Sequence, residues 1–141
     1  MKKMLLMSVT AMLVVVMAAS VNAQSIVYPL EVKIPYDFYV GNTLMHQGDY
    51  EVSTLSIVRG AVKLFGHEGA VVSLTTLVEQ KHAAKTGDEL VFHRVNGEYF
   101  LQSIWTADNP VGFAVPKSRL EREKVALGAS PEVVAVAASH R

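Results

Sequence analysis

The dipeptide Asn96-Gly97 lies between two largely apolar runs, residues 90–95 and 98–105. Both central positions of a type I′ turn need positive φ, which asparagine and glycine adopt more readily than other residues. We therefore expect a tight β-hairpin whose register is set by this turn. The expected pairs are Val95 with Glu98, Arg94 with Tyr99, His93 with Phe100, Phe92 with Leu101 and Val91 with Gln102. The side chains expected to face the core are Leu90, Phe92, Tyr99 and Leu101.

Apolar and polar side chains also alternate through residues 31–40. The apolar parity holds Val32, Ile34, Tyr36, Phe38 and Val40, whereas Tyr39 falls on the polar parity. A period of two is typical of a half-buried strand, and it resumes over residues 49–55 after a loop bracketed by Gly41 and Gly48. Because Pro35 cannot donate a hydrogen bond to a ladder, we expect the first strand to lie at a sheet edge or to bulge.

A helix is predicted near the C-terminus. Ser118 and Glu121 have the spacing of a capping box, in which the hydroxyl and the carboxylate each satisfy an amide at the helix start. The helix is expected over residues 119–127 and to end at Gly128, with Leu120 and Leu127 docked on the sheet. The tail that follows, residues 129–141, can be a final strand, a docked segment or a frayed end.

These patterns predict a mainly β fold with a single domain. We expect a small antiparallel β-sandwich or partly closed barrel of about seven strands, with the one C-terminal helix packed on it. An exposed loop is expected over residues 78–88, where the chain turns polar.

The first residues have the features of a secretory signal. Lys2 and Lys3 precede an apolar run, residues 4–19, broken only by two hydroxyl residues, and small residues stand at 21 and 23 before Gln24. A membrane anchor normally needs ~20 apolar residues, so cleavage after Ala23 is favoured over an uncleaved span. The expected organisation is a signal peptide at 1–23, a β domain at 24–128 and a tail at 129–141. The mature protein is expected to be exported, periplasmic or extracellular, with no membrane span.

Charge and cysteine content narrow the class of partner. Without residues 1–23 the chain carries eleven basic and thirteen acidic residues. This near balance argues against nucleic acid or an anionic membrane as the main partner, since both favour a concentrated positive field. The chain has no cysteine, so the exported domain must be held together by burial alone, and lipid attachment at a cysteine after cleavage is excluded.

Several short motifs together resemble a family of small exported β-rich proteins of unknown function from soil bacteria. They are Phe38-x-Val40-Gly41, Gly48-x-Tyr50-x-Val52, Leu90-Val91-Phe92, Tyr99-Phe100-Leu101, Trp105, and Pro116-Lys117-Ser118-Arg119. The likeness spans nearly the whole mature chain, and it also extends to β-sandwich modules appended to larger exported proteins. That family carries Leu-Pro-Ala-Gly in the first loop, where this chain has Met45-His46-Gln47-Gly48. The resemblance implies a fold and export but no activity.

No arrangement of residue types predicts catalysis or a cofactor. The histidines, His46, His67, His82, His93 and His140, form no short-spaced pair of the kind that zinc sites use. No serine lies in a Gly-x-Ser-x-Gly elbow, and no glycine-rich loop precedes a helix. The carboxylates Asp49 and Glu51 fall on the polar side of a strand, where solvated carboxylates are expected. We therefore expect no catalytic, cofactor or metal residues.

The leading hypothesis is a non-catalytic module that binds a protein or envelope component through a sheet edge and loops. Tyr39, His93 and Phe100 fall outside the presumed core face, so they are either an exposed partner contact or packed under the helix or a second sheet. One alternative is a carrier of a small apolar ligand, with Tyr36, Phe38, Phe92 and Trp105 lining a cavity between the layers. The other alternative is an unrecognised hydrolase.

Overall fold

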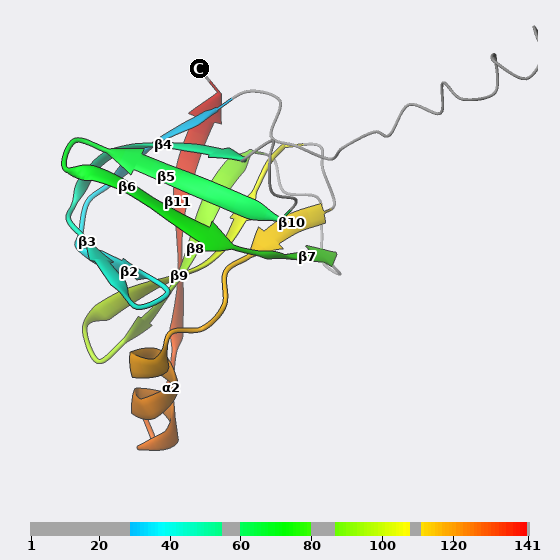
Figure 1. Ribbon diagram of the computed structural model, residues 1–141. Coiled ribbons are helices and arrows are strands. Elements are labelled where there is room, and N and C mark those ends of the chain that lie inside the picture. Colours follow the sequence, from blue (N-terminus) through cyan, green and yellow to red (C-terminus); the bar gives the residue numbers. More distant parts are fainter. Residues whose placement is uncertain (1–28, 55–59, 80–86, 108–110, 141) are drawn as a thin grey trace, which may run out of the picture.

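The computed structural model describes residues 29–54, 60–79, 87–107 and 111–140 (Figure 1). The predicted signal peptide, most of the predicted loop at 78–88 and His82 lie outside these ranges. The described chain forms eleven strands and one helix rather than about seven strands. The elements are β1 (Leu30–Ile34), β2 (Phe38–Val40), β3 (Thr43–Met45), β4 (Gly48–Thr54), β5 (Ala61–Gly66), β6 (Gly69–Leu74), β7 (Thr76–Glu79), β8 (Asp88–Val95), β9 (Glu98–Trp105), β10 (Val111–Ala114), α2 (Arg119–Ala126) and β11 (Glu132–His140). The fold is therefore mainly β with one helix, as predicted.

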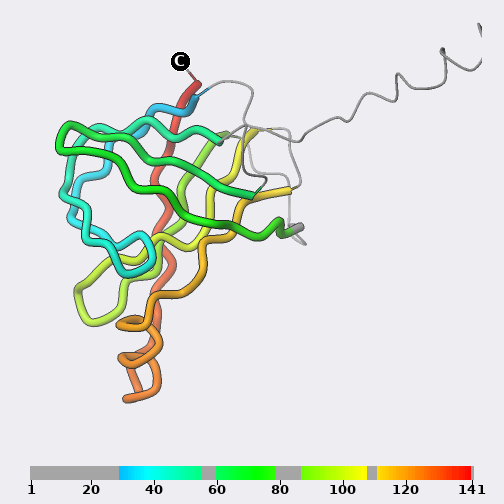
Figure 2. The backbone as a smooth tube through the Cα atoms, in the orientation of Figure 1, coloured from blue at the N-terminus to red at the C-terminus, as the bar shows by residue number. Residues whose placement is uncertain are grey.

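The strands curl into a nearly closed barrel (Figure 2). Their order is β3-β2-β9-β8-β11-β1-β4-β5-β6, and β10 joins β9 to β7, the strand that follows β6. One edge of β9 is shared: β2 pairs with it in parallel at Tyr99 and Phe100, and β10 pairs antiparallel at Ser103 and Ile104. β10 and β7 extend the sheet from β9, but among the described residues β7 has no ladder with β6, and β6 does not pair with β3.

The predicted first strand is two strands. Residues 31–40 divide at Pro35 into β1, which pairs with β4 and β11, and β2, which pairs with β9 and β3. The expectation that this strand lies at an edge is wrong for β1, which lies between two partners. Pro35 sits in the bend between the two strands, so no ladder requires the amide hydrogen that proline lacks.

The core fills the barrel with the side chains that the alternation placed inward. Phe38 and Phe92 are fully buried, with ring centroids 5.5 Å apart and the rings edge to face. Tyr50 meets Phe38 in the same way at 5.3 Å. The other buried members of this cluster are Leu30, Val32, Ile34, Val40, Val52, Val62, Leu64, Leu90, Leu101, Ile104, Phe113 and Val115. Edge-to-face packing of these three rings stabilises the centre of the core.

The β8–β9 hairpin forms as predicted near its turn. Asn96 and Gly97 adopt φ values of 50° and 81°, and the four pairs nearest the turn have the expected register. The fifth pair is wrong: a bulge places Val91 opposite Ser103 instead of Gln102. Because a bulge inserts one unpaired residue, Gln102 and Ser103 can both be directed to the outer face of β9.

Helix α2 begins at the predicted cap. The Ser118 hydroxyl accepts the Glu121 amide at 3.0 Å, and Gly128, with φ of 100°, follows the helix end. Leu127 is 89% exposed, so its expected docking is wrong, and the buried residue of the helix is Glu121. Figure 1 shows α2 at one end of the barrel, close to the turn between β8 and β9.

Of the three structures expected for the tail, the final strand is the one that forms. Residues 132–140 are β11, which pairs with β8 from Glu132 to Ala138 and with β1 at Ser139 and His140. Val136 and Ala138 face the core, whereas Val133 is 67% exposed. This strand is therefore a central member of the barrel wall.

Candidate functional site

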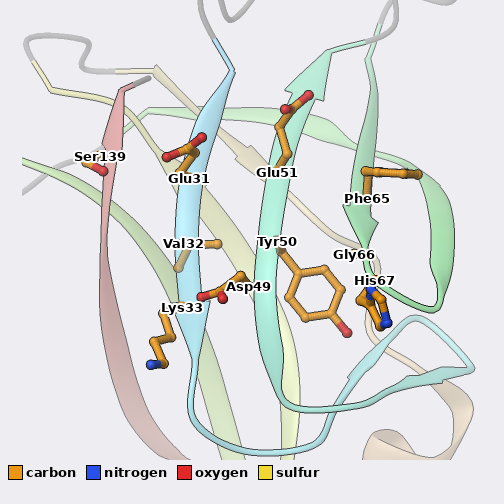
Figure 3. Close-up of a pocket in the computed structure, with 10 residues that line it drawn as sticks. All are labelled: Glu31, Val32, Lys33, Asp49, Tyr50, Glu51, Phe65, Gly66, His67 and Ser139. Carbon is orange, nitrogen blue, oxygen red and sulfur yellow. The ribbon is translucent and has the colours of Figure 1, made fainter.

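A groove of about 690 Å³ lies on the outer face of the barrel wall, across β1, β4 and the end of β5 (Figure 3). Its lining residues are Glu31, Val32, Lys33, Asp49, Tyr50, Glu51, Phe65, Gly66, His67 and Ser139. The strand register aligns them in rows. Ser139, Glu31, Glu51 and Phe65 follow one another across β11, β1, β4 and β5. Four strands thus build one continuous surface, which we call the outer groove.

The outer groove is acidic. Glu31 lies directly opposite Glu51, and Lys33 lies opposite Asp49. The lining holds three carboxylates and one lysine, with His67 at the margin. Carboxylates on facing strands concentrate negative charge on this part of the surface, which favours a positively charged ligand.

Phe65 supplies an aromatic surface beside the carboxylates. Its side chain is 53% exposed, which is high for a phenylalanine, and Lys63 Nζ lies 5.2 Å from the ring centroid. An exposed ring next to acidic groups can stack against a flat or aliphatic part of a ligand while the carboxylates bind its charge.

The barrel wall beneath the outer groove requires a glycine at position 66, because the Tyr50 ring packs against it on the inner side. A Cβ at Gly66 would lie within 3.0 Å of three atoms of the Tyr50 ring, so this ring lies flat against the Gly66 backbone. Burial raises the pKa of the Tyr50 hydroxyl, and the nearby carboxylates of Glu68 and Asp37 raise it further. The hydroxyl donates to the His46 carbonyl. Tyr50 therefore stays a neutral donor and joins β4 to the loop after β3.

A second, smaller hollow of about 240 Å³ lies where β3 and β6 face each other. His46 spans this gap: its Nδ1 is 3.5 Å from Asp37 and its Nε2 is 3.8 Å from Glu68. Asp37 also accepts the Gln47 amide at 2.9 Å. All three ionisable side chains are more than half exposed, so water weakens these contacts. We call this gap the seam.

The structure brings Tyr39, His93 and Phe100 together. Register places Phe100 between His93 on β8 and Tyr39 on β2, and the Tyr39 and Phe100 rings stack with centroids 5.2 Å apart. Phe100 is only 1% exposed, and the His93 side chain is 22% exposed. Phe100 is therefore too buried to contact a partner. Contact with a partner at Tyr39 and His93 stays a prediction.

Glu121 is a fully buried carboxylate that the sequence did not reveal. It is 0% exposed, and its carboxylate accepts Gln102 Nε2 at 2.9 and 3.1 Å and lies 3.0 Å from His93 Nδ1. The capping-box pattern assigned this carboxylate to the helix start; it bonds instead to two strands beneath the helix. A carboxylate that orients a histidine also occurs in hydrolases, but these need a nucleophile on the ring. Among the described residues, no hydrogen bond joins His93 to a hydroxyl.

The four residues expected to line an apolar cavity do not share one. Tyr36, Phe38 and Phe92 pack ring against ring inside the barrel. Trp105 belongs to the other face of β9, where its Nε1 donates to the Ser103 hydroxyl at 2.8 Å and its ring lies against Gly112.

In the described ranges, no group of three or more His, Asp or Glu side chains is placed to hold a metal ion. The helix in the described part of the chain is neither long nor apolar enough to cross a membrane. Comparison with protein-family models, with curated proteins and with solved structures gives no match.

Proposed function

We propose that the mature chain is an exported, non-catalytic β module that binds a protein or cell-envelope component at the outer groove. The observation that supports this proposal most strongly is the row of Glu31, Glu51 and Phe65, in which two facing carboxylates adjoin a half-exposed ring. Such a row favours a partner that presents an amine or guanidinium group attached to an aliphatic stem.

The rigidity of the site also supports a binding role. β1 and β4 are held on both sides by other strands, and their inward residues Val32 and Val52 are at most 4% exposed. The groove side chains therefore project from a wall whose backbone is fixed before any ligand arrives. Binding to a preformed surface loses less conformational entropy than binding to a loop.

The proposal is tested with a defined cationic probe. A fluorescent lysine- and arginine-containing peptide is titrated with wild-type protein and with the double variant Glu31→Gln/Glu51→Gln, and anisotropy is measured at several salt concentrations. The matched control is Glu123→Gln/Glu132→Gln, which removes the same charge from two exposed glutamates remote from the groove. We expect the groove variant to bind at least tenfold more weakly and the control to bind like wild type.

The partner itself is sought by cross-linking the protein in its native host. Cross-links from Lys33 or Lys63 to a partner, lost on Phe65→Ala, support the outer groove as the binding surface. The proposal is overturned if the groove variant and the control bind the probe equally, or if cross-links from wild-type protein avoid the groove.

A further inference from the structure

Strand β6 has an unpaired side. It is hydrogen-bonded to β5 over six residue pairs, from Gly66 with Gly69 to Ala61 with Leu74. Within the described ranges, no strand pairs with the opposite side of β6, which borders the seam. Figure 1 shows β6 at the front of the barrel, with β5 on one side only.

Nothing in the sequence of β6 protects this edge from pairing. Residues 69–78 contain no charged residue and no proline. Natural edge strands are normally blocked by lysine, proline, a bulge or a covering element, because an open edge pairs with other chains. The outward side chains of Val72 and Leu74 are 53% and 65% exposed. An uncharged strand edge with exposed apolar side chains is suited to pairing with a strand of another chain.

The features of β6 favour a second copy of the same chain as the partner. An antiparallel pair of identical strands brings each residue close to its own kind, so any charge near the two-fold axis would repel itself; β6 has none. The seam hollow, flanked by Leu44, Met45 and Ala70, lies beside one end of β6, and the exposed Leu74 lies at the other end. In an antiparallel pair, the seam end of each copy meets the Leu74 end of the other copy, so the same contact forms twice.

The register follows from the alternation of side chains. Residues opposite each other in antiparallel strands point to the same face, so the two residue numbers of each pair must have an even sum. Pairing Val72 with its own copy satisfies this condition and sets Leu74 opposite Ala70 of the second copy. A large side chain then meets a small one next to the seam hollow, whereas a pairing centred on Val71 leaves Leu74 beyond the paired residues.

We propose that two copies of the chain pair antiparallel through β6, with Val72 on the two-fold axis and Leu74 of each copy seated beside Ala70 and Leu44 of the other. The two barrel walls then form one continuous sheet across the axis, and both outer grooves lie on its outer face. A stable interface buries about 800 Å² per partner. Six edge residues and a few half-exposed side chains supply only part of that area, so the dimer depends on protein concentration.

The test measures the molar mass of the mature chain by sedimentation and light scattering over the micromolar range. Wild type is expected to shift from monomer to dimer as concentration rises. Val72→Lys places two like charges at the axis and is expected to abolish the shift. The control Val133→Lys alters an exposed valine on β11 and is expected to leave it unchanged. Circular dichroism shows whether each variant is folded.

A cysteine test remains decisive if Val72→Lys does not fold. Because the chain has no cysteine, Val72→Cys introduces a single thiol. Opposed residues of an antiparallel pair have Cα atoms about 4.5–5.5 Å apart, within the range that a disulfide spans. Mild oxidation is expected to convert Val72→Cys to a covalent dimer and to leave Val133→Cys monomeric.

Four results overturn the proposal: wild type that stays monomeric throughout, a dimer that survives Val72→Lys, equal oxidation of the two cysteine variants, or a native mass spectrum in which a foreign peptide occupies the edge in place of the second copy.

Discussion

His93 on β8 and Glu121 on α2 are 28 residues apart in sequence, and their Nδ1 and Oε1 atoms lie 3.0 Å apart beneath the helix. Gln102 on β9 donates to the same carboxylate at 2.9 and 3.1 Å. One buried carboxylate thus fastens a short, mostly exposed helix to two strands. Because the helix buries little apolar surface, this polar contact carries much of its attachment.

Glu121→Ala is expected to lower the free energy of unfolding by about 3 kcal/mol, because it leaves the His93 ring and the Gln102 amide without their acceptor in a covered site. Urea denaturation measures the loss. The control is Glu123→Ala, which removes an exposed ion pair with Arg119 and should cost less than about 0.5 kcal/mol. Equal losses in the two variants would show that the buried contact is unimportant.

Gly66→Ala is expected to destabilise the barrel by about 1–3 kcal/mol, because the added methyl group must displace the Tyr50 ring on the inner side of the barrel wall. Gly87→Ala serves as the control, since a Cβ there meets no heavy atom within 4 Å. Thermal unfolding compares the two. The same melting temperature in both variants would contradict the close approach of the ring and the backbone.

Tyr36→Phe is expected to reduce the loss of folding stability that occurs as the pH rises above 10. Burial, with a smaller contribution from Tyr99, raises the pKa of Tyr36 from 10.0 to about 12. The folded state therefore keeps the phenol proton more firmly than the unfolded chain does. This contribution to stability is fully present below pH 10 and is lost as the pH rises through about 12. Urea midpoints measured across this interval should fall less steeply for Tyr36→Phe.

The same substitution should cost little at neutral pH. The Tyr36 hydroxyl is buried without a hydrogen-bond partner among the described residues, so its removal sacrifices no such contact. The stacked contact with Tyr99, with centroids 3.6 Å apart, remains available to phenylalanine. A large loss at pH 7, or an unchanged slope at high pH, would contradict this account of Tyr36.

Removal of residues 130–141 is expected to prevent stable folding. Without β11, β8 and β1 both lose a neighbour, and the barrel wall opens along two ladders. Circular dichroism and limited proteolysis of the truncated chain measure the effect. Removal of His140 and Arg141 alone provides the control, because the whole ladder with β8 remains and only one pair with β1 is lost. A folded, protease-resistant truncated chain would show that β11 is dispensable.

Local signals predicted the local structure well. The Asn96-Gly97 turn fixed the register of its hairpin as far as Phe92, and Ser118 marked the helix start. The bulge beyond Phe92 lies next to the residues of β9 that pair with β10, and no local residue pattern marks it. Periodicity likewise identified residues 31–40 as extended without showing that the two halves of this stretch pair with different strands.

Sequence patterns could not predict the candidate site for the same reason. Glu31, Glu51 and Phe65 each appear as ordinary outward residues of separate strands, and only the register unites them in a row. Glu121 fitted a capping box so well that its role as a buried acceptor for Gln102 and His93 gave no separate signal. Contacts between residues far apart in sequence create both the groove row and the buried position of Glu121. Patterns in a single sequence report only on nearby residues.

The pairing of β1 with β11 has a consequence for engineering the chain. Leu30 lies opposite His140, so the beginning and the end of the described domain are neighbours in the barrel wall. A short linker between them would turn the domain into a ring with all its ladders intact. New termini opened at the Asn96-Gly97 turn would then give a circular permutant with the same outer groove and with both ends beside α2.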